Sequence, residues 1–131
     1  MPVTTEDTAI LVMDRGNEDV KLFTSLLEKA GFHVSQSADK GDILHYCRAT
    51  HEGAPIVIID TATHGLHLPE LLDQVQSANP SVRVLLITDG HEPKPAWSDR
   101  SSIRGRLTRP FRRAQFLGSV LEAAKPLALT V

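Results

Sequence analysis

Three short apolar runs, each rich in β-branched residues and each followed by a polar residue, constrain the fold of this chain more than any other feature. They are Ala9 to Met13, Ile56 to Ile59 and Val84 to Ile87. Runs that stay apolar without alternating are typical of strands buried on both faces of a parallel sheet. Such a sheet needs helices on both faces.

The segments between these runs change to the helical period. Apolar residues spaced three or four apart predict four helices. Their apolar stripes are Val20, Phe23, Leu27 and Ala30; Ile43, Leu44 and Cys47; Leu68, Leu71, Leu72 and Val75; and Leu117, Val120, Leu121 and Ala124. Gly31 and Pro126 stand where the first and last helices should stop, and Cys47 is expected to be a small core residue.

Two weaker strands, Phe32 to Ser35 and Gly105 to Thr108, complete five repeats of strand and helix. This order predicts an α/β fold, a doubly wound five-stranded parallel sheet of the flavodoxin-like kind. The repeat after Thr88 is irregular, because Pro93 and Pro95 exclude a regular helix until at least Pro95. We therefore expect a short, displaced or absent fourth helix.

Length and composition indicate one domain, with residues 8–125 as its body and 1–7 and 126–131 as tails. The 131 residues contain a single cysteine, so no internal disulfide is possible. No apolar run approaches the roughly 18 residues that span a bilayer. The polar start lacks the pattern of a signal peptide, so the expected location is the cytoplasm, with no membrane association.

Basic residues are concentrated between Lys94 and Arg113. This stretch holds seven of them and one acid, Asp99, while the rest of the chain is net negative. Such a stretch suits an acidic partner or a nucleic acid, although a solvated basic face is the commoner case. Because no recognition helix or aromatic interleaving accompanies it, we expect a protein partner and keep nucleic-acid binding as an alternative.

Polar residues end the strands at what should be one edge of the sheet. Asp14, Asp60 and Thr88 follow the three apolar runs, and Thr108 and Arg109 end the fifth strand. Binding sites of open α/β sheets lie at this carboxyl edge. The residue types alone fit a cation site, a phosphate site or a satisfied polar rim.

Four segments resemble, in order and separation, the signature segments of response-regulator receiver domains (CheY-like). They are Ile10 to Asp14, Ile56 to Asp60, Leu85 to Thr88 and Leu107 to Phe111. The resemblance runs from about Thr8 to Lys125 and implies the strand order 2-1-3-4-5. It also implies a cis peptide bond between Arg109 and Pro110.

The resemblance assigns roles to the strand-end residues. In that family a strand-end aspartate accepts a phosphoryl group from a histidine kinase, and the matching residue is Asp60. Asp14 matches the first acid of a Mg²⁺-binding pair, Thr88 the switch hydroxyl, and Arg109 a position that is normally lysine. At the position of the second acid, which in the family is usually the direct metal ligand, this chain has Arg15. At the position of the aromatic switch residue it has Arg106.

Arg15 argues against a metal. Two unit charges about 4 Å apart interact by about 4 kcal/mol at an effective dielectric constant near 20, and a divalent ion doubles that repulsion. We therefore expect no cofactor. If the site still supports phosphorylation, Mg²⁺ would bind there, held by Asp14, Asp60 and the backbone of Ala62. Arg15 is expected to pair with Asp60 or Asp14 instead.

These inferences favour an atypical receiver, or pseudo-receiver, that is no enzyme and acts through contacts with a histidine kinase or an output protein. One alternative is a receiver that is still phosphorylated on Asp60. Another is a ligand-binding or enzymatic flavodoxin-like domain, which the single glycine of Asp14 to Asn17 disfavours because phosphate loops are glycine-rich. His64 and His67 are expected to be surface residues, and Trp97 is equally suited to an exposed contact or to covering the sheet.

Overall fold

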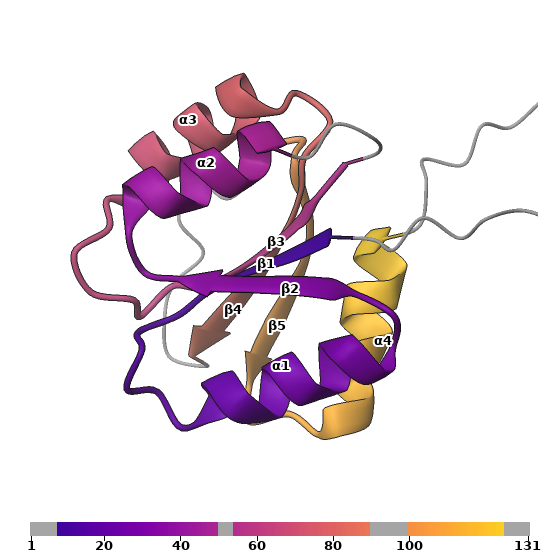
Figure 1. The fold of residues 1–131 in the computed structure, drawn as a ribbon. Coiled ribbons are helices and arrows are strands. Elements are labelled where there is room, and N and C mark those ends of the chain that lie inside the picture. The colour runs from indigo at the N-terminus through magenta and orange to yellow at the C-terminus, as the bar shows by residue number, and fades with distance from the viewer. Residues whose placement is uncertain (1–7, 50–53, 90–99, 125–131) are drawn as a thin grey trace, which may run out of the picture.

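The computed structural model describes residues 8–49, 54–89 and 100–124, which form an alternating series of strands and helices (Figure 1). The elements are β1 (Thr8–Val12), α1 (Asp19–Lys29), β2 (His33–Ser37), α2 (Lys40–Ala49), β3 (Ile56–Asp60), α3 (Leu68–Ala78), β4 (Arg83–Asp89), β5 (Ile103–Arg109) and α4 (Arg113–Ala124). The predicted α/β class is confirmed.

The strands form one parallel sheet in the order β2-β1-β3-β4-β5, as the resemblance implied. The three apolar runs become β1, β3 and β4 at the centre, and every residue of β3 is buried. The weaker strands β2 and β5 lie at the edges and are longer than predicted, since pairing with a neighbour extends β2 to Ser37 and β5 to Arg109.

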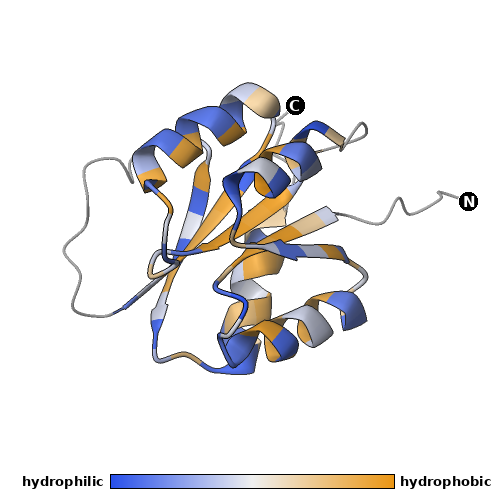
Figure 2. Cartoon of the chain, turned by 60° about the vertical axis from the view of Figure 1, so that its left-hand side comes forward, coloured by the Kyte–Doolittle hydropathy of each residue, from blue (hydrophilic) through white to orange (hydrophobic). Residues whose placement is uncertain are grey.

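Helices cover both faces of the sheet and divide the core into two layers. Helices α1 and α4 pack on one face, and α2 and α3 on the other (Figure 1). Figure 2 shows the central strands as continuous apolar ribbons between helices whose outer faces are hydrophilic. Cys47 is fully buried on the α2 side, as predicted, and burial raises the pKa of its thiol to about 11.

The apolar stripe of the last helix differs from the prediction. Phe116, Val120 and Ala123 are buried in α4, whereas Leu121 is 49% exposed. The phase is set by Phe116, whose ring stacks on Phe23 of α1 with centroids 4.2 Å apart. The predicted stripe began at Leu117 and did not include Phe116, which lies on the buried face of the helix when the stripe is shifted by one residue.

The expected irregular fourth helix, with Pro93, Pro95 and Trp97, lies outside the described residues, so α4 is the helix that follows β5. Within the described ranges, no helix is long and apolar enough to cross a membrane.

Candidate functional site at the carboxyl edge of the sheet

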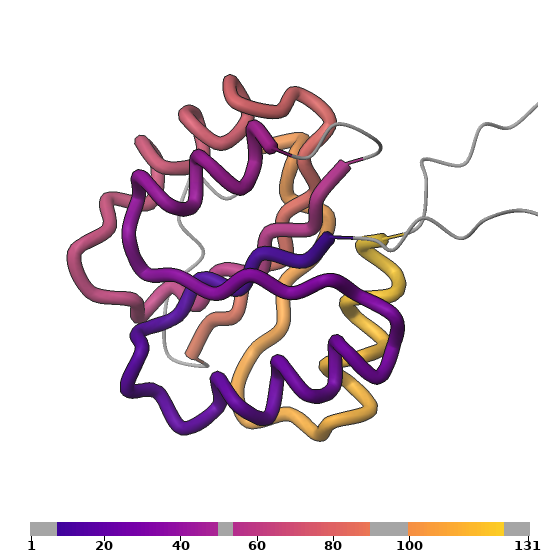
Figure 3. Tube along the Cα trace, viewed as in Figure 1, coloured from indigo at the N-terminus to yellow at the C-terminus, as the bar shows by residue number. Residues whose placement is uncertain are grey.

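The polar strand-end residues gather where the sheet topology predicts. Figure 3 shows the connections that follow β1 and β3 meeting at one edge of the sheet. A bond from the backbone N–H of His64 to the carboxylate of Asp14, 3.1 Å long, joins the two connections. Asp60 and Arg109 are the last residues of β3 and β5, so both reach the same edge.

Asp60 is the buried acid of this site. Its side chain is only 4% exposed. The guanidinium of Arg109 donates to both carboxylate oxygens, at 2.8 and 3.4 Å. The backbone N–H of Ala62 donates to Oδ1 at 2.9 Å, and the side-chain amide of Asn17 approaches Oδ2 at 3.5 Å. Asp60 is therefore satisfied by protein donors from three segments of the chain.

Arg109 is the cation that holds Asp60. Its Nη2 also lies 3.6 Å from the carboxylate of Asp19, and its Nη1 lies 3.7 Å from that of Asp89. The hydrogen bond with Asp60 raises the pKa of Arg109 above its ordinary value, against the opposing effect of burial. One permanent charge thus serves three acids, of which Asp60 is by far the least exposed.

The expected pairing of Arg15 with Asp60 or Asp14 is wrong. Arg15 is exposed, and within the described ranges none of the ion pairs or hydrogen bonds includes it. The guanidinium that meets Asp60 comes from Arg109, which the end of β5 carries to the sheet edge. An exposed guanidinium stays hydrated, so Arg15 needs no acidic partner.

Asp14 is held by His64 instead. Besides the backbone N–H, the ring Nδ1 of His64 lies 2.7 Å from Oδ2 of Asp14. This side-chain hydrogen bond lowers the pKa of Asp14 below its ordinary value. His64 is a surface residue, as predicted, with a side chain 92% exposed, but its contact with Asp14 was missed. No spacing signal points to it, because the contact depends on the path of the loop after β3.

Two hydroxyl residues complete the edge. Thr63 is buried and its Oγ1 donates to the carbonyl of Asp60 at 2.7 Å, with the carbonyl of Val12 at 3.3 Å, which holds the loop after β3 against β1. Thr88 is half-buried and its Oγ1 lies 3.2 Å from that of Thr108. Arg106, at the expected switch position, is exposed on β5. The sequence singled out Thr88 and Arg106 but not Thr63, Asn17, Asp19 or Asp89.

The donor set fits a divalent cation poorly. Mg²⁺ prefers carboxylates, phosphate oxygens and water. In the described part of the chain, no group of three or more His, Cys, Asp or Glu side chains is placed to hold a metal ion. Asp60 already faces Arg109, Asp14 faces His64, and the position next to Asp14 carries a positive charge.

The peptide bond between Arg109 and Pro110 is cis, which confirms the geometry implied by the resemblance. The bond directly follows the arginine that contacts Asp60.

Comparison with known proteins shows the fold. No family model and no curated protein sequence matches the chain. A response regulator receiver domain protein (CheY-like) from Methanospirillum hungatei JF-1 superposes with a TM-score of 0.75 and 17% identity, covering 90% of this chain and 93% of that one. Chemotaxis response regulator CheY4 of Vibrio cholerae gives 0.74 and 20%, with 91% and 99% covered. A structure described as adenylate cyclase from Rhodopirellula baltica gives 0.71 and 15%, with 92% and 88% covered. The chain has the fold of response-regulator receiver domains.

Proposed function

We propose that this chain is a receiver-like module of two-component signalling in which Mg²⁺-dependent phosphorylation of Asp60 is impaired. The observation that carries the proposal is Arg15, which stands beside Asp14 where a metal site needs a second acid. Losing one carboxylate already weakens a Mg²⁺ site, and a cation at that position repels the ion. The exposure of Arg15 lets its side chain turn away, which reduces the repulsion but supplies no ligand.

The contacts of Asp60 support a structural role. The carboxylate links β3 to β5 through Arg109 and to the start of α1 through Asn17. A bidentate pair between an arginine and a carboxylate fixes both groups in direction as well as distance. Asp60 then acts as a counter-ion that orders the sheet edge, and signalling proceeds through protein contacts without chemistry at this residue.

A receiver that is still phosphorylated on Asp60 is the second candidate. Asp60 and Arg109 end β3 and β5, and Thr88 lies one residue before the end of β4 between them; this shared edge favours the second candidate. The two candidates differ in whether an ion and a phosphoryl group can share the pocket with Arg109.

Binding of beryllofluoride, which imitates a phosphoryl group on aspartate, separates these two candidates. We expect wild-type protein to show no Mg²⁺-dependent change in the amide resonances of Asp60, Ala62 and Thr88 when beryllofluoride is added. R15D restores the missing carboxylate and should gain a Mg²⁺-dependent change. R48D makes the same charge reversal at an exposed site on α2 and should gain none. Saturable Mg²⁺-dependent binding by the wild type would contradict the proposal.

The proposed partner is a protein of acidic character, such as a histidine kinase or an output protein. The structure divides the basic stretch: Arg100 pairs with Asp73, and Arg109 pairs with Asp60. Arg112 and Arg113 remain as exposed neighbours at the start of α4. Two adjacent exposed arginines suit an acidic protein surface, while the internal pairing of Arg100 and Arg109 weakens the case for nucleic acid.

A further inference from the structure

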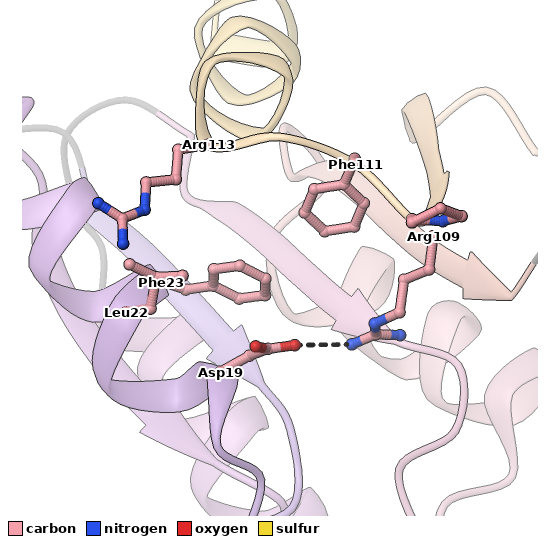
Figure 4. A pocket seen from close by; sticks show the side chains of 7 residues that line it. Asp19, Leu22, Phe23, Arg109, Phe111 and Arg113 are labelled. Atoms are coloured by element: carbon pink, nitrogen blue, oxygen red, sulfur yellow. Dashed lines mark ion pairs between the residues drawn. The ribbon is translucent and has the colours of Figure 1, made fainter.

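A pocket opens beside the site, between the first turns of α1 and the connection from β5 to α4 (Figure 4). Its volume is about 190 Å³. Side chains from both elements line it, among them Asp19, Leu22, Phe23, Arg109, Phe111 and Arg113. The pocket therefore combines an apolar surface with charged groups.

Stacked phenylalanines form the apolar wall. Phe23 is 3% exposed, and its ring centroid lies 5.9 Å from that of Phe111 and 4.2 Å from that of Phe116. The planes of Phe23 and Phe111 differ by 24°, and both residues line the pocket. Because Phe23 is buried and packs against both other rings, this surface exists before any ligand arrives.

Arg113 supplies an unused positive charge at the rim. In Figure 4 its side chain extends from the start of α4 toward Leu22 and Phe23 of α1. It forms no ion pair or hydrogen bond with another residue of the described ranges. The other arginine of the wall, Arg109, is engaged by Asp60 and lies 3.6 Å from Asp19. Because Arg109 is neutralised by these acids, Arg113 is the lining cation that is available to an anion.

We propose that this pocket binds a small amphipathic carboxylate, with an aromatic ring or short alkyl chain on the phenylalanine wall and its carboxylate on Arg113. A cavity of about 150 Å³ suffices to bind benzene, so the volume here accommodates one ring and its carboxylate. A guanidinium binds a carboxylate through two parallel hydrogen bonds, which fixes the orientation of the ligand. The inference goes beyond the proposed function and does not depend on the chemistry of Asp60.

Amide NMR titration of the full chain with benzoate tests this site. Benzyl alcohol keeps the ring without the charge, and acetate keeps the charge without the ring. We expect saturable shifts at Leu22, Phe23 and Phe111 with benzoate, and binding at least about tenfold weaker with either control, because each control lacks one of the two contacts.

Two neighbouring arginines provide a matched pair of variants. R113Q should weaken benzoate binding about tenfold by removing a charge-assisted hydrogen bond. R112Q removes the same charge one residue earlier, outside the pocket wall, and should change binding by less than about twofold because solvent screens it.

Three results would overturn the inference. The first is the absence of a saturable shift with benzoate or hexanoate up to about 50 mM, a concentration that would reveal a millimolar Kd. The second is acetate binding as tightly as benzoate, and the third is an equal loss of benzoate binding in R113Q and R112Q. The second result means an adventitious ion only, and the third a general charge attraction. Mg²⁺-dependent beryllofluoride binding would contradict the proposed function and leave this titration unchanged, so the two failures are distinguishable.

Discussion

Replacing Arg109 by methionine tests whether Asp60 is a structural counter-ion. Removing one partner of a buried ion pair costs about 3–5 kcal/mol. In R109M the carboxylate keeps the N–H of Ala62 at 2.9 Å and the amide of Asn17 at 3.5 Å. Because these donors remain and the side chain of Arg109 is 25% exposed, we expect a smaller loss of unfolding free energy, about 2 kcal/mol at neutral pH.

Urea unfolding followed by circular dichroism measures this loss, with D60N and the double variant D60N/R109M completing a cycle. A coupling free energy of about 1–2 kcal/mol between the two positions is expected for groups in direct contact. R15Q is the matched control, because Arg15 is exposed and without a described partner, and it should change stability by less than about 0.5 kcal/mol. The reasoning fails if R109M unfolds at the wild-type urea concentration, if the cycle is additive, or if R15Q costs as much as R109M.

Three further predictions concern single side chains. H64A should raise the pKa of Asp14 toward its ordinary value in a carboxyl NMR titration, because the hydrogen bond from His64 lowers this pKa. The stability that the lowered pKa contributes is fully present above the pKa of Asp14 in the unfolded chain. It is lost as the pH falls through the pKa of Asp14 in the folded protein. The Cys47 thiol, whose pKa burial raises to about 11, should react slowly with a thiol reagent at pH 8 until urea unfolds the chain; equal rates in both states would contradict its burial. F116A should lower the unfolding free energy by about 3–5 kcal/mol, because Phe116 is fully buried. L121A, at an exposed position of the same helix, should lower it by less than about 1 kcal/mol, and equal losses would support the predicted stripe instead.

The central strands could be predicted because a strand that is buried on both faces of the sheet has an uninterrupted run of apolar residues. In β3 every residue is buried, and Ile56 to Ile59 is apolar without interruption. Edge strands show a weaker pattern. In β5, from Ile103 to Arg109, Leu107 is the only buried residue, so the bounds of the strand depend on its pairing with β4. Pairing is a tertiary property, and local composition does not contain it.

The site was predictable as a set of positions but less so as a set of contacts. Asp14, Asp60 and Arg109 were identified because strand ends in a parallel sheet share one edge. Which arginine reaches Asp60 depends on the path of the backbone at each strand end, which the residue types of Arg15 and Arg109 do not specify. The bond between His64 and Asp14 likewise depends on the loop after β3, where the positive φ of Gly65, 79°, sets a turn that sequence does not specify in detail.

The exposure of Asp14 and Asp60 determines which of these two acids contributes more to the stability of the fold. The side chain of Asp14 is 34% exposed, so water can replace the ring of His64 when that contact is lost. The side chain of Asp60 is 4% exposed, so water cannot replace Arg109 as easily, and only the donors Ala62 N–H and Asn17 would remain. Among the described residues, Arg109 is therefore the cation on which Asp60 depends. An arginine, which is permanently charged and bidentate, pairs with a buried carboxylate more completely than a single ammonium point charge does. In the described part of the chain, the positive charge next to Asp60 is thus supplied by the side chain of Arg109.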